Sequence, residues 1–335
     1  MCIRDSPLSI TGIWSSRVTG QMTRERVIQD EQTRLSKLTL EIERFLDTTL
    51  SDIRILSGST AMQTLAQAIA DRQSLRLEQL RSSVEEDFLN FVSARQIADS
   101  FVYQHIRFLN TNGFEFVRVN NLNGQVNVAA RSTLNTRATE DYFRQTINLT
   151  PGEIYVSPIE IFDEFGRILR PYVPVLRYSM PIYGGETFVG VLVTDVRAEG
   201  FLQLVTAQQN SDGMTFMADQ TGSYIAHPDG DKRFGAAVGT GITVQQESPE
   251  LSFLLDRQQT GVTEAGDNVI VYESTAPEGA SGFFWTVVSV LPLSSVLAIV
   301  QQQEIGILFT LGVVAVISVI AVSYTHLTLP TNREV

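Results

Sequence analysis

Apolar residues in the first part of the chain recur at steps of three and four, with Arg, Glu, Asp and Gln between them. This run extends from Thr23 to Leu56, and its period predicts one long amphipathic helix. The heptad is not strictly kept, which favours packing on the chain's own domain over a dimer seam. A Ser-Gly-Ser segment at 57–59 is expected to end the helix, and a second helical stretch follows over 74–92. We therefore assign residues 15–100 to a long helix and a helical lead-in.

From Phe101 the pattern changes to alternation. The segments on either side of Asn112-Gly113 are predicted to form a β-hairpin. Further strands are predicted over 126–129, 153–157, 173–183 and 188–197, and a short helix over 141–147. This order predicts one antiparallel sheet flanked by helices, in a domain that spans residues 101–205.

A shorter version of the same pattern follows a helical bridge over 199–208. Strands are predicted within MTFMADQTGSYIAHP, GDNVIVYEST and FFWTVVSVLP, and a helix within PELSFLLDRQQ. We interpret residues 206–300 as a second, smaller sheet domain with the topology of the first. The predicted fold class is therefore α+β: a long N-terminal helix, two antiparallel-sheet domains and a C-terminal apolar helix.

The stretch 305–322, IGILFTLGVVAVISVIAV, has eighteen residues without a charge. At 1.5 Å per residue it would cross about 27 Å of hydrocarbon, and it is apolar on every face. We therefore predict a transmembrane helix rather than a buried core helix. The segment 7–14, PLSITGIW, is equally compatible with the tail of a first membrane helix and with no membrane role. The ends, 1–6 and 323–335, resemble translated sequencing-adapter sequence and are expected to be non-native.

Charge and motif content narrow the classes of function. The net charge of −12 gives no basic surface for a nucleic acid. The single cysteine, Cys2, lies in the segment expected to be non-native, so disulfide and thiolate chemistry are not expected. His227 stands in a loop without a second His or Cys nearby, and no nucleophile motif, phosphate loop or metal-ligand spacing appears. We expect no enzyme activity, no cofactor and no nucleic-acid partner.

Two arginines interrupt strands that otherwise have the composition of a core. Arg118 lies in the first hairpin, and Arg177 alternates with Leu176 and Tyr178, so it projects from the opposite face of the sheet. Each arginine could hold an anionic ligand, or it could form a structural ion pair with Glu115, Glu153 or Asp195. The sequence leaves both interpretations open.

Aromatic and hydroxyl residues could form the wall of a ligand pocket. Tyr142 and Tyr155 would supply rings with hydroxyls, whereas core packing is favoured for Phe143. Asp195 follows three valines in alternation and is either a pocket group for a ligand amine, which we favour, or a strand-end cap. The predicted ligand-binding residues are Arg118, Tyr142, Phe143, Tyr155, Ser157, Arg177 and Asp195.

Two sets of motifs resemble the double Cache (PAS-like) sensor modules of bacterial transmembrane receptors, most of all those of sensory histidine kinases. Residues 106–197 are similar to the membrane-distal domain through IRFLNTNGFEFVRVNN, YFRQTINLTPGEIYVSP, YVPVLRYSMPIY and GVLVTDVRAE. Residues 219–235, with a Gly turn followed by IAHP, are similar to the membrane-proximal domain. The resemblance implies a ligand held in the distal domain, between the sheet and the loops and short helix that cover it.

One position departs from the pattern of this family. Amino-acid-binding members carry an arginine two residues before a Trp-Tyr pair, and an aspartate near the end of the last distal strand. Here Tyr142 and Phe143 take the aromatic positions and Asp195 falls in the matching strand, but Glu140 stands where the arginine would be. A carboxylate cannot pair with a ligand carboxylate, which puts recognition of a simple amino acid in doubt.

The resemblance implies an extracytoplasmic small-molecule sensing domain of a transmembrane receptor in the bacterial inner membrane, with residues 15–300 outside the cytoplasm. A histidine kinase is the preferred output, and a diguanylate cyclase or a chemoreceptor is the alternative. A membrane-tethered structural or dimerisation module without a ligand is the rival from another class. The expected partners are an anionic or zwitterionic small molecule, the membrane and a second copy of the chain in a homodimer.

Overall fold

The computed structural model describes the backbone of residues 7–97, 100–122, 124–164, 167–168, 172–207, 213–280 and 282–328, and side chains in most of this range from residue 21 onward. The helices are α1 (Pro7–Ser57), α2 (Thr60–Ala70), α3 (Leu77–Ala94), α4 (Asp141–Thr146), α5 (Glu199–Ala207), α6 (Gly235–Val238), α7 (Val244–Glu247) and α8 (Leu293–Thr328). Short 3₁₀ helices cover Ser74–Arg76, Arg131–Thr133, Gly230–Lys232 and Pro249–Leu255. The predicted non-native segment 1–6, and residues 329–335 of the predicted non-native tail, lie outside the described residues.

The strands belong to two main sheets and two small hairpins. The larger sheet contains β3 (Tyr103–Asn110), β4 (Glu115–Leu122), β5 (Gln125–Val128), β6 (Tyr155–Val156), β7 (Glu160–Ile161), β10 (Pro174–Gly184) and β11 (Thr187–Arg197). The smaller sheet contains β12 (Met214–Asp219), β13 (Tyr224–Ala226), β14 (Thr260–Ala265), β15 (Asn268–Thr275) and β16 (Trp285–Pro292). The hairpins pair β1 (Gln96–Ile97) with β2 (Ser100–Phe101), and β8 (Asp163–Glu164) with β9 (Arg167–Ile168).

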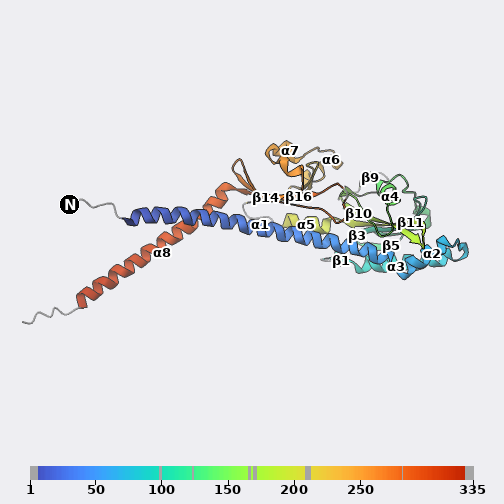
Figure 1. Ribbon diagram of the computed structural model, residues 1–335, viewed down its shortest axis with the longest axis horizontal. Helices are drawn as coiled ribbons and strands as arrows, with labels where there is room; N and C mark the ends of the chain where they lie inside the picture. The colour runs from blue at the N-terminus through green and yellow to red at the C-terminus, as the bar shows by residue number, and fades with distance from the viewer. Residues whose placement is uncertain are drawn as a thin grey trace, which may run out of the picture.

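Helix α1 runs along the molecule and contacts strands of both sheets (Figure 1). Its predicted apolar stripe is buried at Leu35, Leu38, Ile42, Leu46, Leu50, Ile53 and Leu56, which all join the main hydrophobic core. The prediction that this helix packs on its own chain is therefore confirmed. Burying a stripe of this kind is the usual way in which a long amphipathic helix is stabilised.

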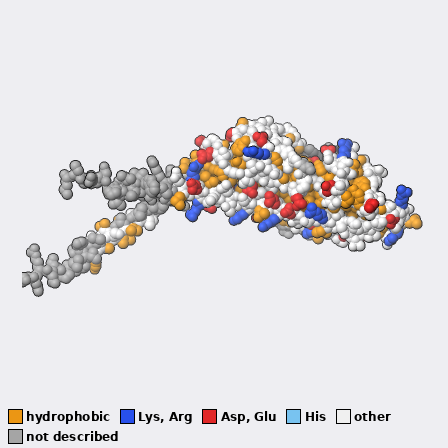
Figure 2. All heavy atoms as spheres, in the orientation of Figure 1, with side chains coloured by type: hydrophobic (Ala, Val, Ile, Leu, Met, Phe, Trp, Pro, Cys, Tyr) orange, Lys and Arg blue, Asp and Glu red, His pale blue; other side chains and the backbone are white. Residues whose placement is uncertain are grey.

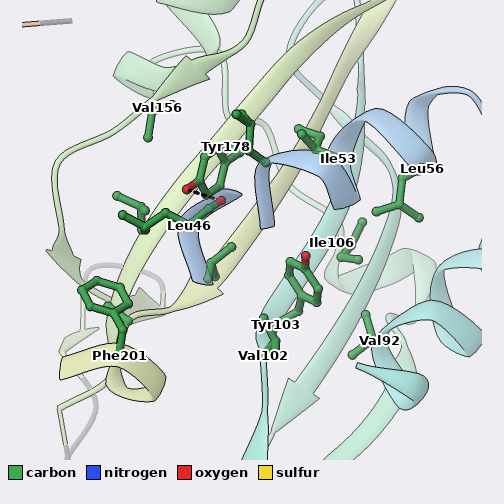
Figure 3. Packing of buried hydrophobic residues seen from close by; sticks show 14 of the residues in the cluster. Leu46, Ile53, Leu56, Val92, Val102, Tyr103, Ile106, Val156, Tyr178 and Phe201 are labelled. Atoms are coloured by element: carbon green, nitrogen blue, oxygen red, sulfur yellow. Dashed lines mark hydrogen bonds between the residues drawn. The ribbon is translucent and has the colours of Figure 1, made fainter. Parts of the chain in front are cut away.

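The larger sheet is antiparallel, with strand order β5-β4-β3-β11-β10-β6, and β7 pairs with β10 beside β6. One face packs against α1, α2 and α3. Figure 3 shows Leu46 and Ile53 of α1 facing Ile106 and Tyr178 of the sheet, and the Tyr178 hydroxyl donates to the Leu46 carbonyl at 3.4 Å. The opposite face is therefore free of the long helices, and α4 covers part of it.

The smaller sheet has strand order β13-β12-β16-β15-β14 and is also antiparallel. In the larger sheet β3 lies between β4, its hairpin partner, and β11, and β11 pairs in turn with β10. In the smaller sheet β12 lies in the same way between β13 and β16, and β16 pairs with β15. Val191 in β11 and Val287 in β16 therefore occupy equivalent strands. The predicted repetition of one topology is confirmed in strand order.

Several elements form where the hydrophobic pattern predicts none, and two of them are the longest. The first is α2, where the Ser59 hydroxyl accepts from the Met62 backbone N–H at 3.2 Å as an N-cap. The second is β14, which pairs with β15 along its whole length at the edge of the smaller sheet. The segment PELSFLLDRQQ, predicted as a helix, contains a 3₁₀ helix over Pro249–Leu255.

The C-terminal helix α8 contains the apolar stretch 305–322 and diverges from the sheets at the end of the molecule where α1 begins (Figure 1). Ile305 and Phe309 are among its exposed apolar side chains, and Figure 2 shows such side chains along this helix. Side chains at several other positions of the stretch lie outside the description. Among the described residues, no helix is both long enough and apolar enough to cross a membrane.

Candidate functional site

The face of the larger sheet that is turned away from α1 carries a row of charged side chains. In β10, Leu176 and Tyr178 join the core on the helix side, so Arg177 projects to the other side, as the alternation predicts. The strand register places Arg177 opposite Asp195 of β11, and Asp195 opposite His105 of β3. Three ionisable groups from three neighbouring strands therefore meet in one cross-strand row.

Asp195 is fully buried at the centre of this row. Its Oδ2 lies 2.7 Å from the Arg107 Nη2, and its Oδ1 lies 3.3 Å from the Arg177 Nε. Burial alone would raise the pKa of Asp195, but the two guanidinium groups outweigh burial and hold this pKa well below its usual range. Asp195 is therefore an ionised carboxylate that neutralises two buried arginines, and it is not a strand-end cap.

Arg177 is held from three sides. Its Nη1 donates to Glu160, its Nε faces Asp195, and its guanidinium lies 5.4 Å from the centre of the Tyr142 ring. Its backbone N–H donates to the Ser157 hydroxyl at 3.0 Å. In the ion-pair interpretation Arg177 thus has two carboxylate partners, and the cation–π contact places its guanidinium beside Tyr142 of α4.

Glu115 is a second buried carboxylate on the same face of the sheet. Its side chain forms ion pairs with Arg118 at 2.8 Å, Arg137 at 3.1 Å and Arg107 at 3.3 Å. Arg118 also donates to the Thr133 hydroxyl at 3.1 Å. These contacts place Arg118 in a structural ion-pair network with Glu115.

His105 is buried beside this network as a neutral ring. The Arg107 Nη2 lies 2.5 Å from the His105 Nδ1, and the Asp195 Oδ2 lies 3.4 Å from the same nitrogen. Burial, together with the positive charge of Arg107, lowers the pKa of His105 to about 4. The Nε2 has no hydrogen-bond partner among the described residues, and the ring stands edge-on to Phe162.

Helix α4 covers the network. Phe143 packs with Leu109, Val191 and Val193, which agrees with the predicted core role of this residue. Tyr142 is buried, and burial raises its pKa to about 12, so its hydroxyl is protonated at neutral pH. A hydrogen bond of 2.5 Å between the Thr146 and Ser179 hydroxyls connects the end of α4 to β10.

A hollow of about 230 Å³ opens between α4 and β6, and we call it the α4–β6 hollow. It is lined by Thr139, Glu140, Asp141, Tyr142, Tyr155, Ser157 and Glu160. Three of the predicted ligand-binding residues, Tyr142, Tyr155 and Ser157, therefore border one cavity. Arg177 and Asp195 lie deeper, and Glu160 links Arg177 to the hollow. Arg118 and Phe143 are not among its lining residues.

Four ionisable groups at this site were not predicted from the sequence: His105, Arg107, Arg137 and Glu160. For the first two a signal existed, because alternation in β3 places both on the face that carries Arg177. Arg137 belongs to the loop before α4, and Glu160 is the first residue of the two-residue strand β7. Alternation cannot assign such positions to a face, so only the structure reveals them.

Comparison with known proteins gives a family and a set of similar folds. The extracellular domain assigned to the histidine kinase vpHK1S-Z8 is 20% identical, with a TM-score of 0.67 over 83% of this chain and 95% of that one. A sensory box/GGDEF family protein domain from Vibrio parahaemolyticus is 20% identical, with a TM-score of 0.68 over 82% and 99%. The ligand-binding domain of the Campylobacter jejuni chemoreceptor Tlp3, in complex with L-norvaline, is 16% identical, with a TM-score of 0.52 over 81% and 92%.

These likenesses show a shared fold, α+β with a long N-terminal helix and antiparallel sheets. No curated protein sequence matches the chain. The family model described as the sensor domain of bacterial histidine kinases matches residues 25–284, which include α2 to α7 and every strand of both main sheets except the last, β16. This chain therefore belongs to the bacterial histidine kinase sensor-domain family.

Proposed function

We propose that the chain senses a small amine-bearing molecule bound in the α4–β6 hollow, as the extracytoplasmic part of a transmembrane receptor. The observation that carries the proposal is the hollow itself. Tyr142, Tyr155 and Ser157 supply polar groups there, directly above a fixed charge network, in a chain of a sensor-domain family. Small-ligand sites commonly combine a concave wall with a few positioned polar groups.

The lining of the hollow favours a positive charge on the ligand. Glu140, Asp141 and Glu160 contribute carboxylates, and no Lys or Arg is among the lining residues. Arg177, the nearest candidate partner for an anion, is already shared between two carboxylates. A zwitterion or an organic cation therefore fits better than a plain anion, because an added anion would face the carboxylates of Glu140 and Asp141, which form no ion pair with a described residue. The L-norvaline complex of the similar chemoreceptor domain is consistent with a zwitterionic ligand.

Helix α1 offers a route from this hollow to the membrane side. It packs under the larger sheet and also contacts β15 and β16 of the smaller one, before the chain leaves through α8. A ligand that binds one arrangement of α4 and the sheet better than another would shift the position of α1, with a coupling of typically ~1–3 kcal/mol. Because the family is that of histidine kinases, we propose a kinase as the output, working as a homodimer.

We further propose that residues 305–322 anchor the receptor in the inner membrane. The support is the run of eighteen uncharged residues and the shared direction in which α1 and α8 leave the sheets. A phosphatase reporter that is active only outside the cytoplasm, fused at residue 300 and again after residue 328, tests this topology. Activity at the first position and not at the second is expected, and equal activity at both would contradict a membrane crossing.

Calorimetric titration of the full chain with a panel of amines, amino acids and carboxylates tests the ligand proposal. Asp141→Asn removes a carboxylate that lines the α4–β6 hollow, and we expect it to weaken binding of an amine by about tenfold. Asp256→Asn, at an exposed position after the 3₁₀ helix of the smaller domain, is the matched control and should leave binding unchanged. Binding of carboxylates alone, or equal effects of the two changes, would contradict the proposal.

A further inference from the structure

A second hollow, of about 440 Å³, lies where the two sheets meet, and we call it the intersheet hollow. Glu140, Glu160 and Arg177 reach it from the larger sheet and its loops. Asp219, Ser223 and Phe234 reach it from the smaller sheet and its loops. Its volume falls within the range of ordinary small-ligand pockets, and domain boundaries are a preferred place for such pockets.

Two carboxylate side chains of this hollow have no Lys or Arg partner in the described part of the chain. The Glu140 side chain forms no hydrogen bond or ion pair with a described residue, and it does not cap α4 although it occupies the N-cap position. The Asp219 Oδ1 accepts from the Thr221 and Ser223 backbone N–H groups at 2.8 and 3.0 Å, but no described Lys or Arg pairs with it. Glu160, by contrast, is neutralised by Arg177.

The remaining wall limits what could occupy the hollow. Ile161, Ile225 and Phe234 make one side apolar. Arg177 is more than nine-tenths buried, and its Nε donates no aligned hydrogen bond, yet its charge is already met by two carboxylates. No group of three or more His, Cys, Asp or Glu side chains among the described residues is arranged to hold a metal ion. The carboxylates of Glu140 and Asp219 are negative and have no described counter-ion, and part of the wall is apolar. An organic cation therefore fits the hollow and an anion does not.

We propose that the intersheet hollow is a second binding site, which takes an organic amine with an apolar body. The ammonium group lies between Glu140 and Asp219, and the apolar body contacts Ile225 and Phe234. Such a molecule touches both sheets at once, so its binding favours the arrangement of the two sheets in which these walls face each other. The site goes beyond the proposed sensing function, because it does not depend on occupancy of the α4–β6 hollow.

Calorimetry on the full chain with 2-phenylethylamine tests the proposal, and 2-phenylethanol serves as the uncharged probe of similar shape. Asp219→Asn keeps an oxygen for the Thr221 and Ser223 N–H groups and removes only the charge. We expect it to weaken amine binding by at least about tenfold. Asp229→Asn is the matched control, because Asp229 also holds a turn, by accepting from the Asp231 N–H at 3.0 Å, and does not line the hollow. This control should bind the amine normally.

A second variant addresses shape rather than charge. Ala237 lines the hollow and is exposed, so Ala237→Trp should fill it and abolish amine binding, while Ala94→Trp at an exposed helix end should not. Asp141→Asn, which tests the α4–β6 hollow, should leave this binding event intact. The proposal is overturned if 2-phenylethanol binds as well as the amine, or if Asp219→Asn and Ala237→Trp bind normally. It is also overturned if Asp141→Asn weakens the same single event as Asp219→Asn, since one ligand would then occupy one continuous site.

Discussion

The buried carboxylate of Asp195 allows a quantitative test of the charge network. In Asp195→Asn the side chain keeps its shape and loses its charge, so Arg107 and Arg177 lose a shared counter-ion in a fully buried place. Removing one partner of a buried ion pair typically costs about 3–5 kcal/mol, because the other charge remains desolvated. Here each arginine keeps a second carboxylate, Glu115 for Arg107 and Glu160 for Arg177. We therefore expect the lower end, a loss of about 3 kcal/mol in the free energy of unfolding.

Thermal unfolding followed by circular dichroism measures this loss. For a domain of this size, about 3 kcal/mol corresponds to a decrease in Tm of about 6–12 °C. Glu78→Gln is the control, because its ion pair with Arg131 is exposed by 61% and 63% and surface pairs contribute at most about 1 kcal/mol. If Asp195→Asn lowers the Tm no more than Glu78→Gln, Asp195 does not neutralise the network.

A double-mutant cycle separates the charge effect from packing. Arg177→Met removes one of the two guanidinium groups that Asp195 serves. If the two residues interact through charge, Asp195→Asn combined with Arg177→Met should cost less than the sum of the single changes. Strict additivity would mean that the 3.3 Å contact between the Arg177 Nε and the Asp195 Oδ1 contributes no interaction energy.

Two further predictions concern the backbone and pH. Gly190→Ala should prevent stable folding or lower the free energy of unfolding by several kcal/mol, because Gly190 has φ +156° and an added Cβ would lie 2.0 Å from the Leu109 carbonyl oxygen. Gly58→Ala should be tolerated. Urea unfolding of both variants measures the difference. His105 has a folded pKa of about 4 against 6.5 unfolded, so the unfolded state gains a proton first as pH falls and stability drops between about pH 6.5 and 4, by up to about 3 kcal/mol. His105→Gln should flatten this slope and His227→Gln should keep the larger part of it, and an unchanged slope in His105→Gln would contradict a buried neutral ring.

The spacing of apolar residues within single segments predicted much of the fold. The stripe of α1 and the alternation in β10 and β11 predicted both the element types and the faces that are buried, because these features depend only on the period of each element. Helix α2 and strand β14 were missed for opposite reasons. The segment of α2 is apolar and has an N-cap, but it directly follows the Ser-Gly-Ser segment that ends α1, so it was not recognised as a separate helix. Strand β14 is an edge strand, and its polar, partly exposed residues show little alternation between apolar and polar positions.

The candidate site was predictable only in part. Alternation identified Arg177 and Asp195 as side chains on the face opposite the core, and the structure brings them into contact. It could not say whether they meet each other or a ligand, because that depends on which strands are neighbours and in what register. Glu160, which decides how Arg177 is neutralised, comes from a short strand that no periodic signal marks.

By itself, then, the sequence determined the α+β class, the long helix, the two sheets and the faces on which charged residues lie, since these follow from the spacing of apolar residues along one chain segment. Only the tertiary structure decided that Asp195 is shared by Arg107 and Arg177, that Glu115 pairs with three arginines, and that Glu140 borders two hollows without a partner among the described residues. The physical reason is that an ion pair or a cavity joins side chains from separate elements, and its energy depends on burial and on distances of a few ångströms. Strand order and loop placement set those distances, and no single segment contains that information.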